Sequence, residues 1–254
     1  MCRSFSYTLL ITWILFLFAC KTVVVKTSVT SQNISITKDI NPVDSQLIQI
    51  YLPYKNILEK DMSRVISYSE TAMDKDKPES TLTNFLADLL IEEGRIEAEK
   101  LRLDFHPQVS YFNYGGIRAP IPKGNITVGN IFELMPFENE LVFVSLTGKQ
   151  LQEFLDIIAS KGGDSVGGVR FVISNQKAID VKIEGEKLMP ESNYWIVTND
   201  YIANGGDGME IFNGRQEIIN TSEKIRDVII SYLEKKQNQG KELHAELDGR
   251  IRNE

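Results

Sequence analysis

Helix-like and strand-like segments alternate along most of this chain of 254 residues. Short apolar, β-branched runs predict strands at residues 65–69, 109–112, 140–146, 169–173, 178–183 and 194–198. Helices are expected around them, at about 41–62, 81–101, 127–134, 148–160 and 221–235. In residues 81–101 the apolar positions are spaced to give one buried face. This alternation predicts an α+β fold in which a mixed sheet is flanked by helices.

Two of these helices carry specific start signals. Asn41 followed by Pro42 is typical of a helix cap and first turn, and this helix is expected to run to about Met62. We expect it to bury the apolar residues Leu47, Ile48, Tyr51, Ile57 and Leu58. Thr221 is the expected cap of a last helix that ends at about Lys235.

The first 20 residues have the pattern of an export signal. Arg3 precedes a nearly unbroken apolar run from Leu9 to Ala19, and Cys20 follows directly. We interpret residues 1–20 as a lipoprotein signal peptide with Cys20 as the lipidation site, residues 21–40 as a tether and residues 41–254 as one folded domain. An uncleaved anchor and an ordinary signal are the alternatives. The lipoprotein interpretation places the protein at a bacterial cell envelope, lipid-anchored and facing the periplasm or the outside.

Composition excludes several classes of function. A formal net charge of −7 without a basic cluster argues against nucleic-acid polymers as partners. The 2 histidines, His106 and His244, lie far apart, whereas a two-metal phosphoesterase needs several clustered ligands. The sequence contains neither a Gly-x-Ser-x-Gly elbow nor a P-loop. We therefore expect no metal or other cofactor in this chain and no catalytic residue.

A glycine-rich cluster directly after the predicted strand 194–198 has the residue types of a ligand site. Tyr201 offers an aromatic face, and Asn204 begins the segment Asn-Gly-Gly-Asp-Gly. Gly206 lets a ligand approach the main chain closely. Asp207 can accept hydrogen bonds from two sugar hydroxyls.

A second cluster follows the predicted strand 109–112. Asn113 offers a donor and an acceptor to a base edge, and Gly115 and Gly116 form a second glycine pair. Arg118 can bind ribose, carboxylate or phosphate oxygens with its planar guanidinium. Phe137, in a loop after Pro136, can sandwich a flat heterocycle together with Tyr201. In the competing interpretation the glycines only form turns, the rings complete the core and Arg118 pairs with Asp207.

Four motifs in order resemble a known family. They are Asn113-x-Gly-Gly-Ile-Arg118, Met135-Pro136-Phe137, the Thr-Gly-x-Gln-Leu that ends at Leu151, and Tyr201-Ile-Ala-Asn-Gly-Gly-Asp207. Residues 65–251 resemble the C-terminal domain of the 5'-nucleotidase / UDP-sugar hydrolase family. The resemblance implies that Phe137 and Tyr201 stack a base, that Asn113 contacts base or sugar, and that Arg118 and Asp207 bind the ribose region.

This sequence departs from the family pattern at three points. Tyr201 replaces a phenylalanine, and Thr83 replaces a glycine in the motif that begins at Glu79. An arginine expected shortly before Glu79 is absent, and Asp76 and Lys77 occupy this stretch. The family also has an N-terminal metallophosphatase domain with two metals, for which residues 21–64 are too few.

Three functions fit this pattern. The first is a nucleotide-binding component of a 5'-nucleotidase-type hydrolase in nucleotide catabolism, inactive alone, for which a separate metallophosphatase chain supplies divalent metals. Its ligand would be a nucleoside 5'-monophosphate or a nucleoside. The second is a non-catalytic nucleoside-binding surface lipoprotein, and the third is a scaffold with purely structural turns. The sequence does not separate the first two.

Overall fold

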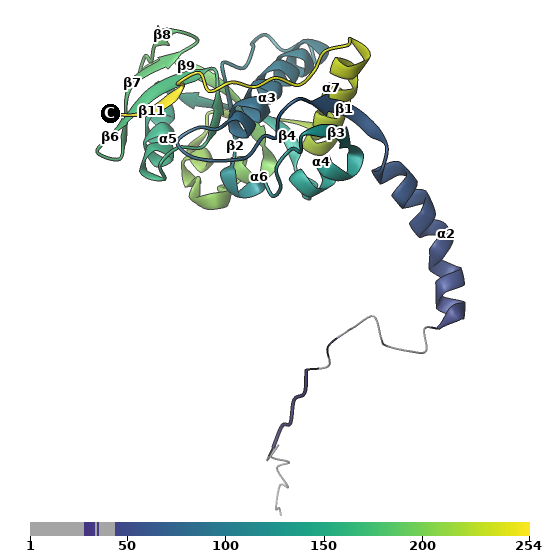
Figure 1. Cartoon of the computed structure of the whole chain (residues 1–254). Helices are drawn as coiled ribbons and strands as arrows, with labels where there is room; N and C mark the ends of the chain where they lie inside the picture. The colour runs from purple at the N-terminus through teal and green to yellow at the C-terminus, as the bar shows by residue number, and fades with distance from the viewer. Residues whose placement is uncertain (1–27, 34, 36–43) are drawn as a thin grey trace, which may run out of the picture. The chain divides into compact units, whose positions relative to one another are not determined.

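A computed structural model describes residues 28–33, 35 and 44–254 (Figure 1). The predicted signal peptide with Cys20, much of the tether and the predicted cap at Asn41 and Pro42 lie outside the described residues. The chain divides into two compact units, residues 1–50 and 51–254, and all of the sheets lie in the second. Among the described residues, none of the helices combines the length and the apolar character needed to span a bilayer.

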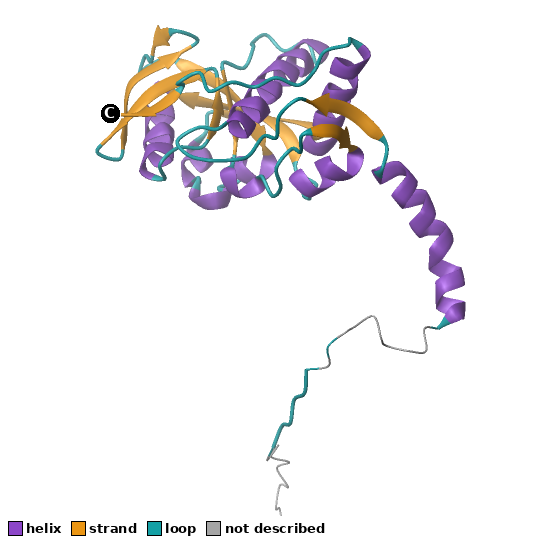
Figure 2. Cartoon of the chain, in the orientation of Figure 1, coloured by secondary structure: helices purple, strands orange, loops and turns teal. Residues whose placement is uncertain are grey.

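A five-stranded sheet forms the centre of residues 51–254 (Figure 2). Its strands, in spatial order, are β10 (Glu217–Lys224), β4 (Glu140–Thr147), β9 (Asn193–Asn199), β2 (Val109–Phe112) and β5 (Ser165–Gly167). Strands β2 and β9 are parallel, and the other neighbours are antiparallel. The central sheet is therefore mixed, as expected.

Both faces of this sheet are covered, because alternate residues of its strands point to opposite sides. In β4, Leu141 and Phe143 belong to one apolar core, whereas Val142 and Val144 belong to the other. The first core also contains residues of α3 (Thr81–Lys100), α4 (Val128–Leu134), α7 (Ile225–Asn238), β1 (Val65–Ser69) and β3 (Gly124–Thr127).

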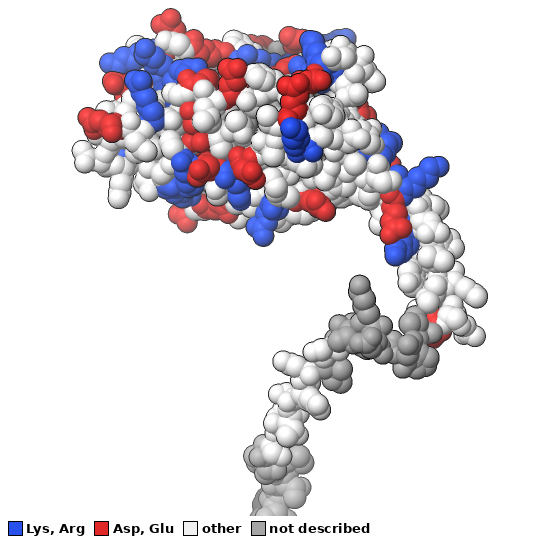
Figure 3. All heavy atoms as spheres, in the orientation of Figure 1, with Lys and Arg blue, Asp and Glu red and all other residues white. Residues whose placement is uncertain are grey.

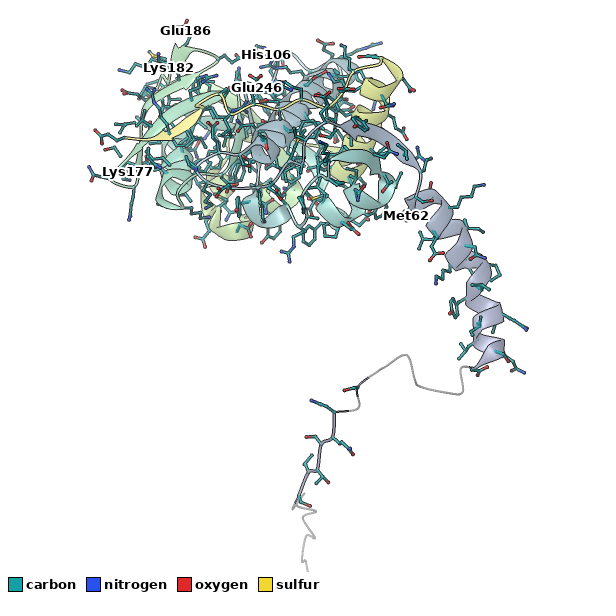
Figure 4. All side chains as sticks on the ribbon, viewed as in Figure 1. Met62, His106, Lys177, Lys182, Glu186 and Glu246 are labelled. Carbon is teal, nitrogen blue, oxygen red and sulfur yellow. The ribbon has the colours of Figure 1, made fainter. Side chains whose placement is uncertain are left out.

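The second core lies between the central sheet, α5 (Gly148–Ser160) and a smaller sheet. The smaller sheet has the order β11 (Ile251–Asn253), β6 (Val169–Ser174), β7 (Lys177–Ile183) and β8 (Glu186–Lys187). Figure 4 labels Lys177, Lys182 and Glu186 in this sheet. Helices on one face of a mixed sheet, with a helix and a second sheet on the other, confirm the α+β prediction.

Side-chain caps explain why three predicted helices begin where expected. Ser80, Thr127 and Thr147 each accept a hydrogen bond from a backbone N–H three residues later. The side chain at that later position accepts from the cap's own N–H in each case, which completes a capping box.

The last helix was predicted too early. Helix α7 begins at Ile225, because the preceding residues form β10 and pair with β4. Thr221 lies inside this strand, and its hydroxyl donates to the Leu141 carbonyl at 2.8 Å instead of capping a helix. Strands β3, β5, β8, β10 and β11 were not predicted.

The expected burial of the first helix is also wrong. Helix α2 (Ser45–Met62) forms, but none of its residues is buried. Of the five residues expected inside, Ile48 is half-buried and the other four, Leu47, Tyr51, Ile57 and Leu58, are exposed. Met62, the last residue of α2 (Figure 4), packs partly buried against the first core. Apolar periodicity predicts a face that needs a partner, but it does not say that the partner belongs to the same chain.

Candidate functional site

The two predicted glycine clusters meet at one edge of the central sheet. Strands β2 and β9 are parallel, and therefore their carboxyl ends lie at the same edge. Asn113 follows β2, and α6 (Asp200–Ala203) follows β9. The loop that contains Phe137 leads into β4 at this edge, where the Glu140 N–H donates to the Asp200 carboxylate at 3.0 Å.

Asp207 is the centre of a hydrogen-bond network that joins the clusters. Its Oδ2 accepts from Asn113 Nδ2 at 2.7 Å, and its Oδ1 accepts from the Tyr201 hydroxyl at 2.9 Å. Asn113 is 4% exposed, and its Oδ1 accepts from Asn199 Nδ2 at 3.1 Å. Asn199 also caps α6 by accepting from the Ile202 N–H. A carboxylate has about four lone-pair sites, so Asp207 keeps acceptor capacity for a ligand.

Close packing explains the glycines around this network. A Cβ on Gly115 would lie 2.9 Å from Asp207 Oδ2, and a Cβ on Gly116 would lie 2.8 Å from Asn113 Oδ1. A Cβ on Gly206 would lie 2.4 Å from the Tyr201 ring. These positions need glycine because the main chain passes directly beside the network's side chains.

Arg118 and Asn204 belong to the same loops but not to the network. The Arg118 side chain is exposed and donates from Nη1 to the Gly115 carbonyl at 3.3 Å. Within residues 44–254 no ion pair joins it to Asp207, the pairing that the competing interpretation required. Asn204 Nδ2 donates to the Asp200 carbonyl at 2.8 Å and thereby closes the end of α6.

Both predicted stacking rings are accessible at this edge. Phe137 is 41% exposed and Tyr201 is 46% exposed. Neither ring completes the core, which was the competing interpretation. Exposed aromatic faces can stack a flat heterocycle, and the Tyr201 ring also joins the polar network through its hydroxyl.

Two lysines beside these loops were not proposed as site residues. Lys75 Nζ donates to the carbonyls of Tyr114 and Ile117 at 3.1 and 2.6 Å and lies 4.3 Å from the centre of the Tyr114 ring. Lys77 Nζ lies 5.0 Å from the same ring. Partial burial, with the Arg118 charge as a smaller cause, lowers the pKa of Lys75. One sign in the sequence indicated that a cation belongs here: Lys77 lies in the stretch before Glu79 where the family pattern has an arginine.

A buried acid also lies near the network and was missed. Asp164 is 5% exposed, and burial raises the pKa of its carboxyl to about 6. Hydrogen bonds from the Ser165 N–H at 2.8 Å and the Tyr111 hydroxyl at 3.0 Å partly offset this rise. Burial is also the largest cause that raises the pKa of Tyr111, followed by the Asp164 charge and, more weakly, the Asp207 charge.

The described residues do not fit the two metals that the family uses. Among them, no group of three or more His, Cys, Asp or Glu side chains is placed to hold an ion. In Figure 3, acidic and basic side chains are interspersed over the face in view rather than gathered into one charged surface. This edge offers the accessible rings of Phe137 and Tyr201 and hydrogen-bonding groups from Asp207 and Arg118.

Known proteins match this chain over most of its length. Residues 60–214 match the family described as "5'-nucleotidase, C-terminal domain". The "Trifunctional nucleotide phosphoesterase protein YfkN" of Bacillus subtilis (strain 168) is 33% identical over 63% of this chain and 12% of that protein. "Protein UshA" of Escherichia coli (strain K12) is 27% identical over 76% of this chain and 35% of that protein. This chain thus matches about a third or less of these relatives' lengths.

A solved structure supports the same assignment. The 5'-nucleotidase precursor from Thermus thermophilus has a TM-score of 0.67 and 27% identity, over 84% of this chain and 44% of that chain. The family match covers more than half of this chain and includes both glycine clusters. The chain belongs to the 5'-nucleotidase C-terminal domain family.

Proposed function

We propose that this protein is the nucleotide-binding component of a 5'-nucleotidase-type hydrolase, which acts with a metallophosphatase on a separate chain. Its ligand is a nucleoside 5'-monophosphate or a nucleoside. The observation that carries the proposal is the edge of the central sheet where accessible Tyr201 joins the Asn113–Asp207 network and where accessible Phe137 lies in the loop that leads into β4.

Each part of this edge has a role toward a nucleoside. The faces of Phe137 and Tyr201 stack the base, which is worth about 1–3 kcal/mol per ring. The remaining lone pairs of Asp207 accept hydrogen bonds from ribose hydroxyls, and Arg118 donates to the ribose region. Asn113 holds Asp207 in place through its 2.7 Å hydrogen bond.

Binding at a distance from the phosphate can serve catalysis on another chain. Contacts with base and ribose fix the position of the substrate, so that the phosphate is presented to the reacting groups at little further entropic cost. The metallophosphatase would supply the divalent metals, for which the described residues offer no donor set.

Two measurements on the purified chain test the proposal. We expect it to bind adenosine and AMP in calorimetric titration, and Asp207→Ala to weaken both at least tenfold. We also expect no release of phosphate from AMP with Mn²⁺ or Zn²⁺ alone. No binding by the wild-type chain, or metal-dependent phosphate release that survives purification to homogeneity, would overturn it. Binding without any partner phosphatase in the native cells would instead favour a non-catalytic nucleoside-binding lipoprotein.

We also propose that the protein is held at a bacterial cell envelope through acylated Cys20. The support is the apolar run that ends at Ala19 directly before this cysteine. In cells fed with a clickable palmitate analogue, the wild-type chain is expected to be labelled and Cys20→Ser to remain unlabelled. Equal labelling of both would refute the anchor.

A further inference from the structure

The loop that carries Phe137 is held by the start of α7. This loop spans residues 135–139 and connects α4 with β4. Helices α4 and α7 lie side by side (Figure 1). Four of the five backbone carbonyls of the loop accept hydrogen bonds from residues 224–226, where β10 meets α7. The position of the loop is therefore determined by this junction.

Arg226 makes most of these contacts. Its Nη1 donates to the carbonyls of Met135 and Phe137, at 3.4 Å each, and its Nη2 pairs with the Glu138 carboxylate. The guanidinium also lies over the Phe132 ring, with its Cζ 4.0 Å from the ring centre. The whole residue is only 7% exposed. A buried, planar guanidinium with several partners holds the backbone at Phe137 in one position.

The two residues before Arg226 hold the rest of the loop. Lys224 Nζ donates to the Glu138 carbonyl at 3.0 Å and to the Glu140 carboxylate at 2.8 Å. The Ile225 N–H donates to the Asn139 carbonyl at 3.0 Å. An N–H in the first turn of a helix has no partner within its own helix, so the loop supplies one.

Both ends of the loop are also linked to the candidate site. The Leu134 carbonyl, directly before the loop, accepts from the Arg118 N–H at 2.9 Å. Directly after the loop, the Glu140 N–H donates to Asp200 Oδ1 at 3.0 Å, and the same oxygen accepts from the Tyr201 N–H at 2.9 Å. The loop therefore has a defined position relative to Arg118 and Tyr201.

Stability alone does not explain an arginine at position 226. The residue lies in the first turn of α7, where the positive end of the helix dipole disfavours a cation. Its Nε is buried, and among the described residues this atom has no hydrogen-bond partner. Such an unpaired donor costs free energy. Departures from these local rules are expected mainly at functional sites.

We infer that Arg226 is a positioning residue for nucleoside binding. It holds the loop 135–139 in the position in which the Phe137 ring is accessible for stacking. The inference rests on the proposed function, in which Phe137 stacks the base. Arg226 acts through the loop and needs no contact with the ligand. The alternative is an arginine that only stabilises the fold.

Calorimetric titration of the full-length chain with adenosine separates these two roles. The test variant is Arg226→Met, made alone and together with Phe137→Ala. Methionine keeps an apolar side chain in the buried space, and the Glu138 side chain that loses its partner is 67% exposed, so no buried charge is left unpaired. The matched control is Arg250→Met, which removes another arginine that is 7% exposed and makes its ion pairs in other parts of the fold.

We expect Arg226→Met to weaken adenosine binding about fivefold or more, but by no more than Phe137→Ala does. In the chain that already carries Phe137→Ala, the same substitution should change the affinity by less than about twofold, because the ring through which it acts is gone. Arg250→Met should bind adenosine as well as the wild-type chain. Urea unfolding of the two arginine variants measures how much stability each has lost.

Four results would overturn the inference. Three of them leave the proposed function intact: wild-type affinity in Arg226→Met, the same loss of affinity with and without Phe137, and equal losses in Arg226→Met and Arg250→Met at equal loss of stability. The last of these three would assign Arg226 to the fold alone. The fourth result, no adenosine binding by the wild-type chain, would overturn the proposed function as well.

Lys224→Met provides a second test that applies even if Arg226→Met does not fold. The Lys224 side chain is 35% exposed, and the substitution removes only one hydrogen bond to a loop carbonyl and one ion pair. It should weaken adenosine binding by about twofold or more, and only in chains that keep Phe137. Unchanged affinity in this variant would contradict a loop held by the junction of β10 and α7.

Discussion

Replacement of Asp164 by asparagine is expected to change how the stability of this protein depends on pH. Burial raises the pKa of this carboxyl from 3.8 to about 6. The folded chain therefore binds a proton at Asp164 more tightly than the unfolded chain. The stability that this group contributes is fully present below about pH 4 and is lost as the pH rises through about 6.

The size of the effect follows from the same numbers. Each tenfold change in proton affinity is worth about 1.4 kcal/mol, so the rise to about 6 corresponds to about 3 kcal/mol. Asparagine has a similar shape: its oxygen can accept from the Ser165 N–H in place of Oδ1, and its Nδ2 can donate to the Tyr111 hydroxyl in place of Oδ2. Because it does not titrate, Asp164→Asn should become more stable relative to the wild-type chain by up to about 3 kcal/mol between about pH 4 and pH 7.

Urea unfolding of both chains at several pH values across this range measures the difference between their free energies of unfolding. Other titrating groups affect both chains alike and cancel in the comparison. Tyr111→Phe provides a second variant, because the lost hydroxyl stabilises the ionised form of Asp164. Its removal should raise the pKa of Asp164 further and steepen the loss of stability with pH. If the free energies of unfolding of Asp164→Asn and the wild-type chain differ by the same amount at every pH between about 4 and 7, the reasoning is refuted.

Three substitutions test other parts of the structure. Gly206→Ala places a methyl group 2.4 Å from the Tyr201 ring and so should displace the ring. Adenosine should then bind about 5- to 150-fold more weakly in calorimetric titration. Unchanged affinity would contradict the stacking role. Arg118→Lys keeps the charge but loses the planar fork, and it should weaken adenosine and AMP to a similar degree; a loss confined to AMP would move Arg118 from ribose to phosphate. Phe154→Ala removes a buried ring that packs edge-on against Tyr111 and Phe212, with ring centres 4.9 and 5.2 Å apart. Urea unfolding should show a loss of about 3–5 kcal/mol in the free energy of unfolding. A loss below about 1 kcal/mol would contradict the packing.

Local signals predicted the elements whose ends are determined by neighbouring residues. The capping boxes at Ser80 and Thr147 and the apolar periodicity behind them place α3 and α5 closely. Strand β10 was missed because its polar residues resemble a helix start, and only pairing with β4 decides its conformation. The exposure of α2 was missed because periodicity does not identify the partner.

The candidate site was predictable in composition and less so in geometry. The glycines near Tyr201 and Asn113 were expected to let a ligand approach the main chain, and in the structure the side chains of Tyr201, Asn113 and Asp207 pack against them. Sequence spacing gave no sign that Asn113, rather than Arg118, contacts Asp207. Asp164 was missed because its raised pKa comes from burial between segments distant in sequence, which no local pattern records.

Adenosine titration of Phe137→Ala and Tyr201→Ala tests most directly whether two rings clasp a nucleoside at the edge of the central sheet. Tyr54→Ala, which removes an accessible ring from α2, is the control. Each of the two site variants should bind adenosine about 5- to 150-fold more weakly than the wild-type chain, and the control should bind it equally well. Wild-type affinity in both site variants would contradict a nucleoside site between these rings.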